Sequence, residues 1–389
     1  EFRRVLFRSP ARFDPRALAG DNAPNIVREF LMSASAIKPT RIFAGGAYYK
    51  TSVKNFKGGL FRTTPESGQW EALTRGLPEN PESRIVKFHP TEPDVVYAGT
   101  QDGVYRSLNG GDTWERLGFP DKGAIVWSLA FHPGNPKTMY AGLAPVGVYR
   151  SDDGGNTWRK LKNATTPEYC PMSFPTRTIG IAVDPLRPDD IYVALEVSGV
   201  IHSRDGGETW TDVTAPLIKL SEDFPHLKSR IESDTDASGM LDSHAIIMSS
   251  ATPGRAVLGV RMGLFRTDDH GASWHDMRVG KDSPLTYCRC VVTSPHNPAT
   301  LYAGLSASSR GKDGSLYRSD DSGANWRRYD HGVTAHATIM SCDVHRKDPS
   351  RVYCVSRCGE VFGTEDDGKS WQTYKLPDGV EDVYSVTCG

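Results

Sequence analysis

The side chains best suited to proton transfer lie far apart in the sequence, so only the fold can bring them together. Histidine exchanges protons near neutral pH, and a carboxylate can orient it or act as a base or nucleophile beside it. A tyrosine hydroxyl can join them as a further proton donor. Five residues of these types are our catalytic candidates: His244, His336, Glu196, Asp242 and Tyr287.

Arginines are the second group that could do chemistry. A guanidinium group recognises carboxylate, phosphate or sulfate through forked, charge-assisted hydrogen bonds. One arginine alone most often pairs with a nearby carboxylate or loop carbonyl, whereas several around one axis would form an anion-receptive funnel. With two aromatic residues they make up the substrate-binding candidates: Arg84, Arg177, Arg261, Arg289, Arg357, Trp127 and Tyr384.

A divalent metal is the alternative use of the same histidines. His244, His336 and Asp242 have the ligand types that zinc and related metals take. The sequence has no HExxH and no CxxC motif, and Cys288 and Cys290 alternate as core residues of one strand do. The sequence leaves the cofactor unknown, and it favours a funnel without a divalent metal over a funnel with one.

Composition narrows the class of protein. The chain has 389 residues with 46 Lys and Arg against 47 Asp and Glu, a net charge of -1 that argues against nucleic-acid binding. No apolar run approaches the ~18 residues of a membrane span. Glycine (38) and proline (26) are abundant, which indicates many turns. Seven cysteines, an odd number, exclude a complete disulfide framework and favour the cytoplasm, while a missing native leader leaves a secreted or periplasmic location open. We expect a monomer.

The elements that must position these side chains are given by a repeat. Seven of the eight tryptophans follow one another at intervals of 44, 44, 52, 64, 52 and 45 residues, and each of the seven ends a phrase such as GVYRSDDGGNTW at 147–158. The copy at 59–70 is degenerate, with Pro65 at the aspartate position. The repeated residues are Trp70, Trp114, Trp158, Trp210, Trp274, Trp326 and Trp371.

Each repeat contains four short strands separated by turn residues. An apolar strand and a His-Pro or Asp-Pro turn, as at 86–90, precede a strand ending in Ala-Gly, as at 95–100. The tryptophan phrase adds two more strands. Four strands in about 45 residues, repeated seven times, predict an all-β, seven-bladed propeller. The first unit lacks an inner strand, so we expect residues 383–388 to pair with 41–46 and close the ring.

The phrase Ser-x-Asp-x-Gly-x-Thr-Trp resembles the Asp box of the BNR repeat family. That family includes sialidases, xyloglucanases, sortilin-type receptors and photosystem II assembly factors, and the resemblance covers residues 38–389. It implies the propeller fold but no particular activity. Sialidases use an arginine triad with a Tyr–Glu pair, but they have six blades, so we do not carry that activity over.

The box aspartates have a structural interpretation and a functional one. In the structural one they accept backbone N–H bonds across a tight turn whose glycines suit positive φ. A calcium loop of the EF-hand kind would need a ligand ladder and a glutamate at position twelve, which are absent. We expect a structural role for Asp153, Asp205, Asp269, Asp321 and Asp366, with Asn109 forming the same turn in blade two.

The domain prediction has two parts. Residues 1–37 are interpreted as a leader, of which 1–10 are non-native, and residues 38–389 as one propeller. An insertion at 215–242 has helical spacing at Leu220, Phe224, Leu227 and Ile231, which predicts an amphipathic lid over the funnel. Two further rim loops are expected at 162–177 and at 47–58, the latter with Tyr48, Tyr49 and Lys50.

Two functions fit this sequence. The first is a hydrolase or lyase that acts at the funnel on an anionic or polyhydroxylated small molecule or glycan. The second is a non-catalytic binding module or assembly factor that docks an acidic partner on the same arginines. Convergence of His244, His336 and a carboxylate would favour the enzyme, whereas an open, flat rim would favour the module.

Overall fold

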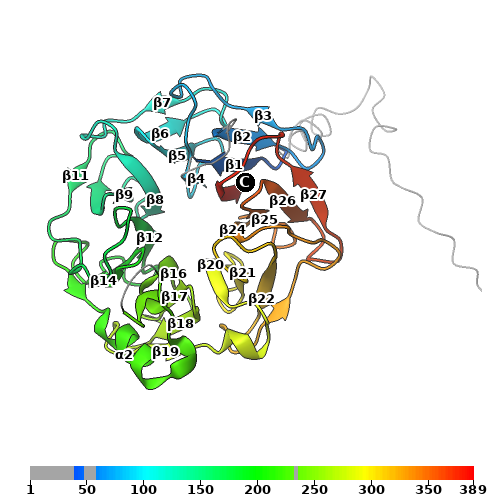
Figure 1. Ribbon diagram of the computed structural model, residues 1–389. Coiled ribbons are helices and arrows are strands. Elements are labelled where there is room, and N and C mark those ends of the chain that lie inside the picture. Colours follow the sequence, from blue (N-terminus) through cyan, green and yellow to red (C-terminus); the bar gives the residue numbers. More distant parts are fainter. Residues whose placement is uncertain (1–38, 48–57, 232–234) are drawn as a thin grey trace, which may run out of the picture. The chain divides into compact units, whose positions relative to one another are not determined.

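Seven four-stranded antiparallel sheets surround a central axis, as the repeat predicts (Figure 1). The structure is a computed structural model, which describes residues 39–47, 58–231 and 235–389. Residues 41–389 form one compact unit. The seven-bladed propeller is therefore confirmed. The loop candidates Tyr48, Tyr49 and Lys50 and the predicted leader lie outside the described residues.

The blades follow one another in chain order, and within each blade the strands run from the axis outward. Blade one contains β28 (Val383–Cys388), β1 (Ile42–Gly46), β2 (Gly59–Thr63) and β3 (Glu71–Ala72); blade two contains β4 (Ile85–Phe88), β5 (Val96–Thr100), β6 (Gly103–Ser107) and β7 (Glu115–Arg116). Blade three contains β8 (Ile125–Phe131), β9 (Met139–Ala144), β10 (Gly147–Ser151) and β11 (Arg159–Lys160); blade four contains β12 (Thr178–Val183), β13 (Ile191–Leu195), β14 (Gly199–Ser203) and β15 (Thr211–Asp212).

The remaining blades repeat the pattern, with the helices as additions to it. Blade five contains β16 (Ser243–Met248), β17 (Ala256–Val260), β18 (Gly263–Thr267) and β19 (His275–Asp276); blade six contains β20 (Tyr287–Thr293), β21 (Leu301–Ser306), β22 (Gly314–Ser319) and β23 (Arg327–Arg328). Blade seven contains β24 (Ile339–Val344), β25 (Val352–Ser356), β26 (Glu360–Thr364) and β27 (Gln372–Lys375). The helices are α2 (Ala215–Asp223), η2 (Pro225–Leu227), α3 (Ser238–Leu241) and η3 (Val279–Lys281).

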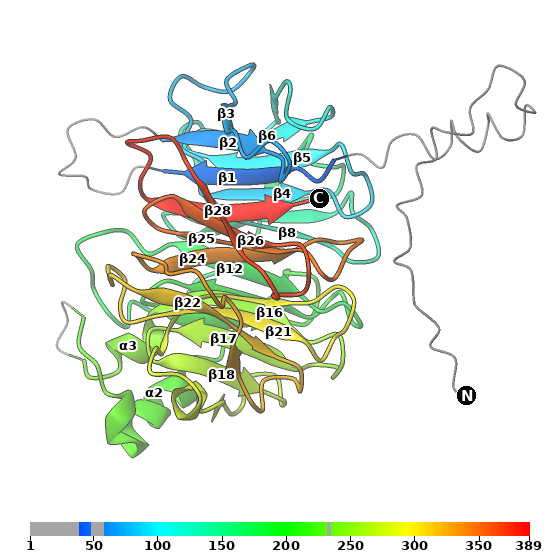
Figure 2. The same ribbon diagram turned by 90° about the vertical axis from the view of Figure 1, so that its right-hand side faces the viewer.

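The last strand of the chain closes the ring. β28 pairs with β1 in antiparallel register, with Ile42 opposite Cys388 and Ala44 opposite Val386 (Figure 2). Blade one thus takes its inner strand from the C-terminus, as the missing strand in the sequence predicts. The pairing covers the open edge of β1, since an unpaired edge strand exposes backbone donors and acceptors.

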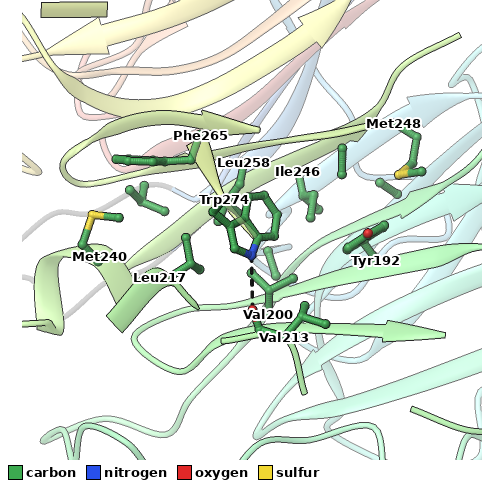
Figure 3. Close-up of a cluster of buried hydrophobic side chains, with 14 of the residues drawn as sticks. Tyr192, Val200, Val213, Leu217, Met240, Ile246, Met248, Leu258, Phe265 and Trp274 are labelled. Atoms are coloured by element: carbon green, nitrogen blue, oxygen red, sulfur yellow. Dashed lines mark hydrogen bonds between the residues drawn. The ribbon is translucent and has the colours of Figure 1, made fainter. Parts of the chain in front are cut away.

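Hydrophobic side chains fill the space between neighbouring blades. One cluster joins Tyr192 and Val213 of blade four to Leu258, Phe265 and Trp274 of blade five (Figure 3). The indole Nε1 of Trp274 donates to the Val213 carbonyl at 3.2 Å, which ties the box tryptophan of one blade to the preceding blade. Such packing stabilises each blade only when its neighbour is present, so the ring must unfold as a unit.

The Asp boxes form local turn networks. Asp205 Oδ1 accepts from Ser203 Oγ at 2.8 Å and from the Thr209 backbone N–H at 2.9 Å, while Oδ2 accepts from Thr209 Oγ1 at 2.6 Å. These bonds hold the pKa of Asp205 at about 2. Gly207 has φ of +94°, where a side chain would be strained. Asn109 accepts from the Thr113 N–H at 3.0 Å in the same way. The Asp205 carboxylate is therefore engaged within its own turn, as the structural interpretation of the boxes expects.

The insertion at 215–242 folds differently from its predicted helix. The helix α2 begins with Pro216 in its first turn and ends at Asp223, before Phe224. Pro225 then starts the short 3-10 helix η2, because proline cannot supply the N–H that would continue α2. The predicted helical stripe through Ile231 is therefore wrong. Leu217 and Leu227 pack into the core between blades four and five instead.

No helix among the described residues combines the length and apolar character needed to cross a membrane.

Ring closure can be tested by removing β28. We expect a chain truncated after Asp382 to lose its single cooperative thermal transition, because β1 then exposes an edge and the core between blades one and seven opens. Circular dichroism during heating measures this. Val386→Ala keeps the backbone pairing and serves as the control, with a lowered Tm but one sharp transition. A truncated chain that melts like the full-length chain would contradict the closure account.

The structural role of the boxes can be tested at Asp205. We expect Asp205→Ala to lower the free energy of unfolding by about 1–2 kcal/mol, because three turn hydrogen bonds are lost. The matched variant is Asp205→Asn, which copies the natural Asn109 turn and should cost less. Denaturant unfolding measures both. Equal losses for the two variants would show that the turn bonds are not the cause.

Candidate functional site

A pocket of about 290 Å³ opens at one end of the central axis. Blades four to seven and the closing strand β28 all contribute to its wall, so no single blade could form it. The rim loop predicted at 162–177 supplies part of the lining. The pocket, called the axial pocket below, is lined by Met172, Ser173, Phe174, Arg177, Glu196, Val197, Ile231, Asp242, Arg261, Tyr287, Arg289, Ser309, Arg310, Arg357 and Tyr384.

A repeated β-bulge turns one side chain per blade toward the axis. The register of the inner strand slips by one residue near the start of β8, β12, β16, β20 and β24, and also in β28. A bulged residue has no partner opposite it, which re-aims its side chain. The six extra residues all line a cavity of about 260 Å³ along the axis, the axial channel: Trp127, Ile179, His244, Arg289, Met340 and Tyr384.

Glu196 joins two of the predicted arginines. It follows β13, and its Oε2 accepts from Arg177 Nη1 at 2.6 Å. Its other oxygen, Oε1, lies 3.4 Å from Arg289 Nη1. All three side chains are at most 10% exposed, so the ion pairs are little screened by water. One carboxylate thus holds two guanidinium groups at the wall of the axial pocket.

Asp242 is the second buried carboxylate of the site. Its Oδ2 accepts from Arg261 Nε at 3.1 Å, and its Oδ1 lies 3.1 Å from His244 Nε2. Burial acts to raise the pKa of Asp242, but His244, Arg261 and Arg289 outweigh burial and lower it to about 2. Asp242 is therefore ionised at neutral pH and can anchor a cation or accept a proton, but it cannot donate one.

His244 and Tyr287 form a buried pair whose polar atoms lie close together. His244 Nδ1 lies 2.8 Å from the Cys288 carbonyl, which can only accept, so Nδ1 carries a proton. His244 Nε2 faces both Asp242 and the Tyr287 hydroxyl, which is 3.3 Å away. Burial raises the pKa of Tyr287 to about 12, so its hydroxyl stays protonated at neutral pH. If Nε2 carries a proton, it can donate to Asp242; if Nε2 is unprotonated, it can accept from the Tyr287 hydroxyl.

Aromatic rings hold the arginines in place. The Arg177 guanidinium lies 4.5 Å from the ring centroids of both Trp127 and Phe174. Arg84 lies 5.1 Å from the same Trp127 ring and pairs with Glu82 at 2.5 Å, so Arg84 faces the axial channel rather than the axial pocket. Cation–π contacts of this kind are strongest where water is excluded. Trp127 Nε1 is buried and donates to none of the described residues.

Blade seven and the closing strand complete the rim. Arg357 Nε donates to Asp382 Oδ1 at 2.7 Å, and Arg357 Nη1 donates to the Ser309 carbonyl at 2.8 Å. Tyr384 lies 6.0 Å from the Arg357 guanidinium and 5.3 Å from Trp127, centroid to centroid. Arg310 and Asp382 were not among the candidates. The length of the β21–β22 loop and an acidic residue just before the closing strand are the sequence signals that could have identified them.

His336 does not join His244. It lies outside the axial pocket, where its Nδ1 is 2.7 Å from Glu360 Oε1 and its side chain is 72% exposed. The prediction that the two histidines converge is therefore wrong. The physical reason is the β-bulge, because blade seven turns Met340 toward the axis, while His336 precedes β24 and remains at its outer edge.

The lid over the funnel remains a prediction. From the segment 215–242, the described residues that line the axial pocket are Ile231 and Asp242. Figure 1 shows α2 beside the outer strand β19, away from the axis. Leu220 and Phe224 line a separate hollow next to Trp274.

A metal ion at this site would compete with arginines for the same carboxylates. Glu196, Asp242 and His244 each bring one possible ligand atom within 4.8 Å of the others. The same carboxylates already accept from Arg177, Arg261 and Arg289. A cation would have to displace these guanidinium groups, whereas an anion would be attracted by them. The donor set fits an anionic ligand better than a metal ion.

Known proteins resemble the chain in part. A family model described as "Sortilin, neurotensin receptor 3" matches residues 314–387. The vacuolar protein sorting/targeting protein 10 of Colletotrichum graminicola is 30% identical over 128 residues, 29% of this chain and 8% of that protein. An oligoxyloglucan-reducing end-specific xyloglucanase of Emericella nidulans is 26% identical over 201 residues, 48% of this chain and 22% of the relative.

A solved structure extends the likeness to most of the chain. The GH74 xyloglucanase of Xanthomonas campestris superposes with a TM-score of 0.56 at 18% identity, over 78% of this chain and 46% of that one. The resemblance to Asp-box propellers is confirmed. Because the chain spans only 8% and 22% of the two relatives' length, activity has to be argued from the site itself.

The electrostatics of the site make a prediction about acid stability. The pKa of Asp242 is lower in the folded chain than its ordinary 3.8, so its stabilisation is complete above about pH 4 and is lost as pH falls toward 2. The shift corresponds to about 2 kcal/mol. We expect Asp242→Asn to lower the free energy of unfolding at pH 7 and to differ less from the native chain near pH 2. Denaturant unfolding across this range measures it, with exposed Asp313→Asn as the control. A pH-independent difference would contradict the assignment.

Proposed function

We propose that the axial pocket binds an anionic, hydroxyl-bearing small molecule or glycan and cleaves it as a hydrolase or lyase. One observation carries the proposal: five arginines and Tyr287 line the same enclosed space, and the Tyr287 hydroxyl lies 3.3 Å from Nε2 of the buried His244. The arginines are Arg177, Arg261, Arg289, Arg310 and Arg357.

The charge of the wall sets the class of ligand. Among the described residues, the lining of the axial pocket contains five arginines and two carboxylates, Glu196 and Asp242. Like charges near one axis repel each other in a poorly screened site. A bound carboxylate, phosphate or sulfate group relieves that repulsion, and guanidinium forks match its geometry. Phe174 and Tyr384 add apolar faces of the kind on which a sugar ring can rest.

The proton chemistry belongs to His244 and Tyr287. The protonated Tyr287 hydroxyl can donate to a leaving oxygen, and His244 Nε2, 3.3 Å away, can exchange a proton with it. The Arg261 guanidinium lies 5.6 Å from the Tyr287 ring and stabilises negative charge that develops on its oxygen. The ionised Asp242 holds His244 in place. Glu196, Arg84, Trp127 and Tyr384 then act in binding and positioning, and His336 has no part.

The relatives support glycan cleavage as the reaction class. Both the Emericella nidulans protein and the Xanthomonas campestris structure are named xyloglucanases. Their names support a glycan ligand, and the arginines of this chain favour one that carries acidic groups.

A binding module is the second candidate function. The observation in its favour is that Asp242 is ionised and fully engaged with Arg261 and His244, so this carboxylate cannot serve as the acid of a two-carboxylate hydrolase. An acidic peptide would satisfy the same arginines without being cleaved.

Turnover of a substrate panel distinguishes the two functions. The panel contains oligosaccharides of uronic acids, sulfated oligosaccharides and neutral xyloglucan oligosaccharides. New reducing ends report hydrolysis, and ultraviolet absorbance of a conjugated double bond reports elimination. We expect turnover of an anionic glycan, and a loss of at least about 100-fold in kcat for Tyr287→Phe, the scale of general acid catalysis. Tyr105→Phe in blade two is the matched control.

Binding is measured separately by thermal shift with glucuronate, sulfate and a poly-glutamate peptide. We expect glucuronate to raise Tm, and Arg261→Ala to reduce that rise, while Arg255→Ala on the outer surface of blade five should leave it unchanged. A Tm rise with the peptide but no turnover of any glycan would favour the binding module. The proposal that the axial pocket binds anions would be overturned if no anion raised Tm, or if Arg261→Ala and Arg255→Ala changed the rise equally.

A further inference from the structure

A second cluster of ligand-type side chains lies at the opposite end of the blades from the axial pocket. Asp190 directly precedes β13, and His202 lies on the neighbouring strand β14. His270 comes from the Asp-box turn between β18 and β19 of blade five. Glu196 stands at the other end of β13, about 20 Å away along the strand. The cluster therefore belongs to neither the axial pocket nor the axial channel.

The three side chains bring their donor atoms together. One ligand atom each from Asp190, His202 and His270 lies within 4.8 Å of the other two. His202 Nε2 is 3.4 Å from Asp190 Oδ1. A carboxylate with two imidazoles is a common zinc ligand set, which leaves a fourth position for water.

Two imidazole nitrogens of the cluster lack a hydrogen-bond partner among the described residues. His202 Nε2 and His270 Nδ1 are buried, and neither makes a hydrogen bond with any described residue. The His202 side chain is 3% exposed, so water does not reach it readily. Buried polar atoms in folded proteins are nearly always satisfied, and each exception requires an explanation. A bound cation would satisfy both nitrogens at once.

The surroundings prepare His202 and Asp190 for this role. The Tyr192 ring stacks on His202 at a centroid distance of 4.2 Å and fixes its orientation. Arg187 Nε lies 3.1 Å from Asp190 Oδ2, which leaves Oδ1 directed at His202.

His270 is the adjustable member of the cluster. Its ring lies within 16° of parallel to the His202 ring, at a centroid distance of 5.5 Å. Two parallel rings cannot both point at one ion in their planes, so binding requires rotation of one ring. The χ2 torsion of histidine is soft, and His270 is only half-buried on its turn.

We propose that Asp190, His202 and His270 bind one Zn²⁺ ion that links blade four to blade five. The ion would cross-link blades four and five, which the hydrophobic cluster described above also joins. Because the site exists only when both blades are folded, binding stabilises the folded chain. Arg187 pairs with Asp190 Oδ2 and orients the carboxylate. Arg204 Nε lies 3.7 Å from Asp190 Oδ1, and its side chain is 67% exposed, so it can move aside for the ion.

Zinc chloride and the chelator-treated full chain test the proposal. We expect calorimetry to show one equivalent bound and the melting temperature to rise with zinc. Cobalt(II) chloride should give the visible absorption of a four-coordinate site, a readout that does not depend on stability. His270→Ala, on a turn where it should not prevent folding, should weaken zinc binding at least about 100-fold. His331→Ala, an exposed histidine outside the cluster, should bind as the native chain does.

The alternative location for an ion is the axial pocket. Asp242→Asn removes one ligand of that second group and should leave zinc binding unchanged. The proposal is overturned if the native chain binds no zinc, if His270→Ala binds as the native chain does, or if binding is lost in Asp242→Asn instead.

Discussion

A single extra residue at the start of the inner strands determines which side chains meet at the axis. Six of the seven innermost strands carry this β-bulge, and the bulged residues include Trp127, His244, Arg289 and Tyr384. Blade one depends on β28 for its innermost strand, which brings Tyr384 to the channel and places the preceding residue Asp382 against Arg357. Ring closure and site assembly are therefore one event, because the chain cannot complete the pocket until its last strand pairs with β1.

Charge balance then controls what the pocket can do. Glu196 and Asp242 are buried and engaged with arginines, so they neutralise part of the wall and leave it net positive among the described residues. Tyr287 belongs to this wall, and its hydroxyl lies 3.3 Å from Nε2 of the buried His244.

Features that recur at regular spacing could be predicted from the sequence, whereas features that depend on a local irregularity of one strand could not. The tryptophan spacing predicted the blades and the closing strand, and the matching blade positions predicted Arg177, Arg261 and Arg357. A β-bulge leaves no mark in an alternating pattern, so His336 was placed at the axis instead of Met340. The helix α2 lies within the predicted insertion but ends at Asp223, and Pro225 prevents one continuous helix from Leu220 to Ile231. Asp190, His202 and His270 come together only through the contact of two blades, which no spacing reveals.

The central claim is that the axis binds an anion through guanidinium groups supplied by several blades. A crystal structure of the protein grown with glucuronate tests this most directly. The account predicts the carboxylate of the ligand within hydrogen-bond distance of Arg261 and at least one of Arg177, Arg289 and Arg357, with a ligand hydroxyl near Tyr287. Glucuronate seated on the outer surface of the blades, with the axial pocket unchanged and filled by water, would contradict it.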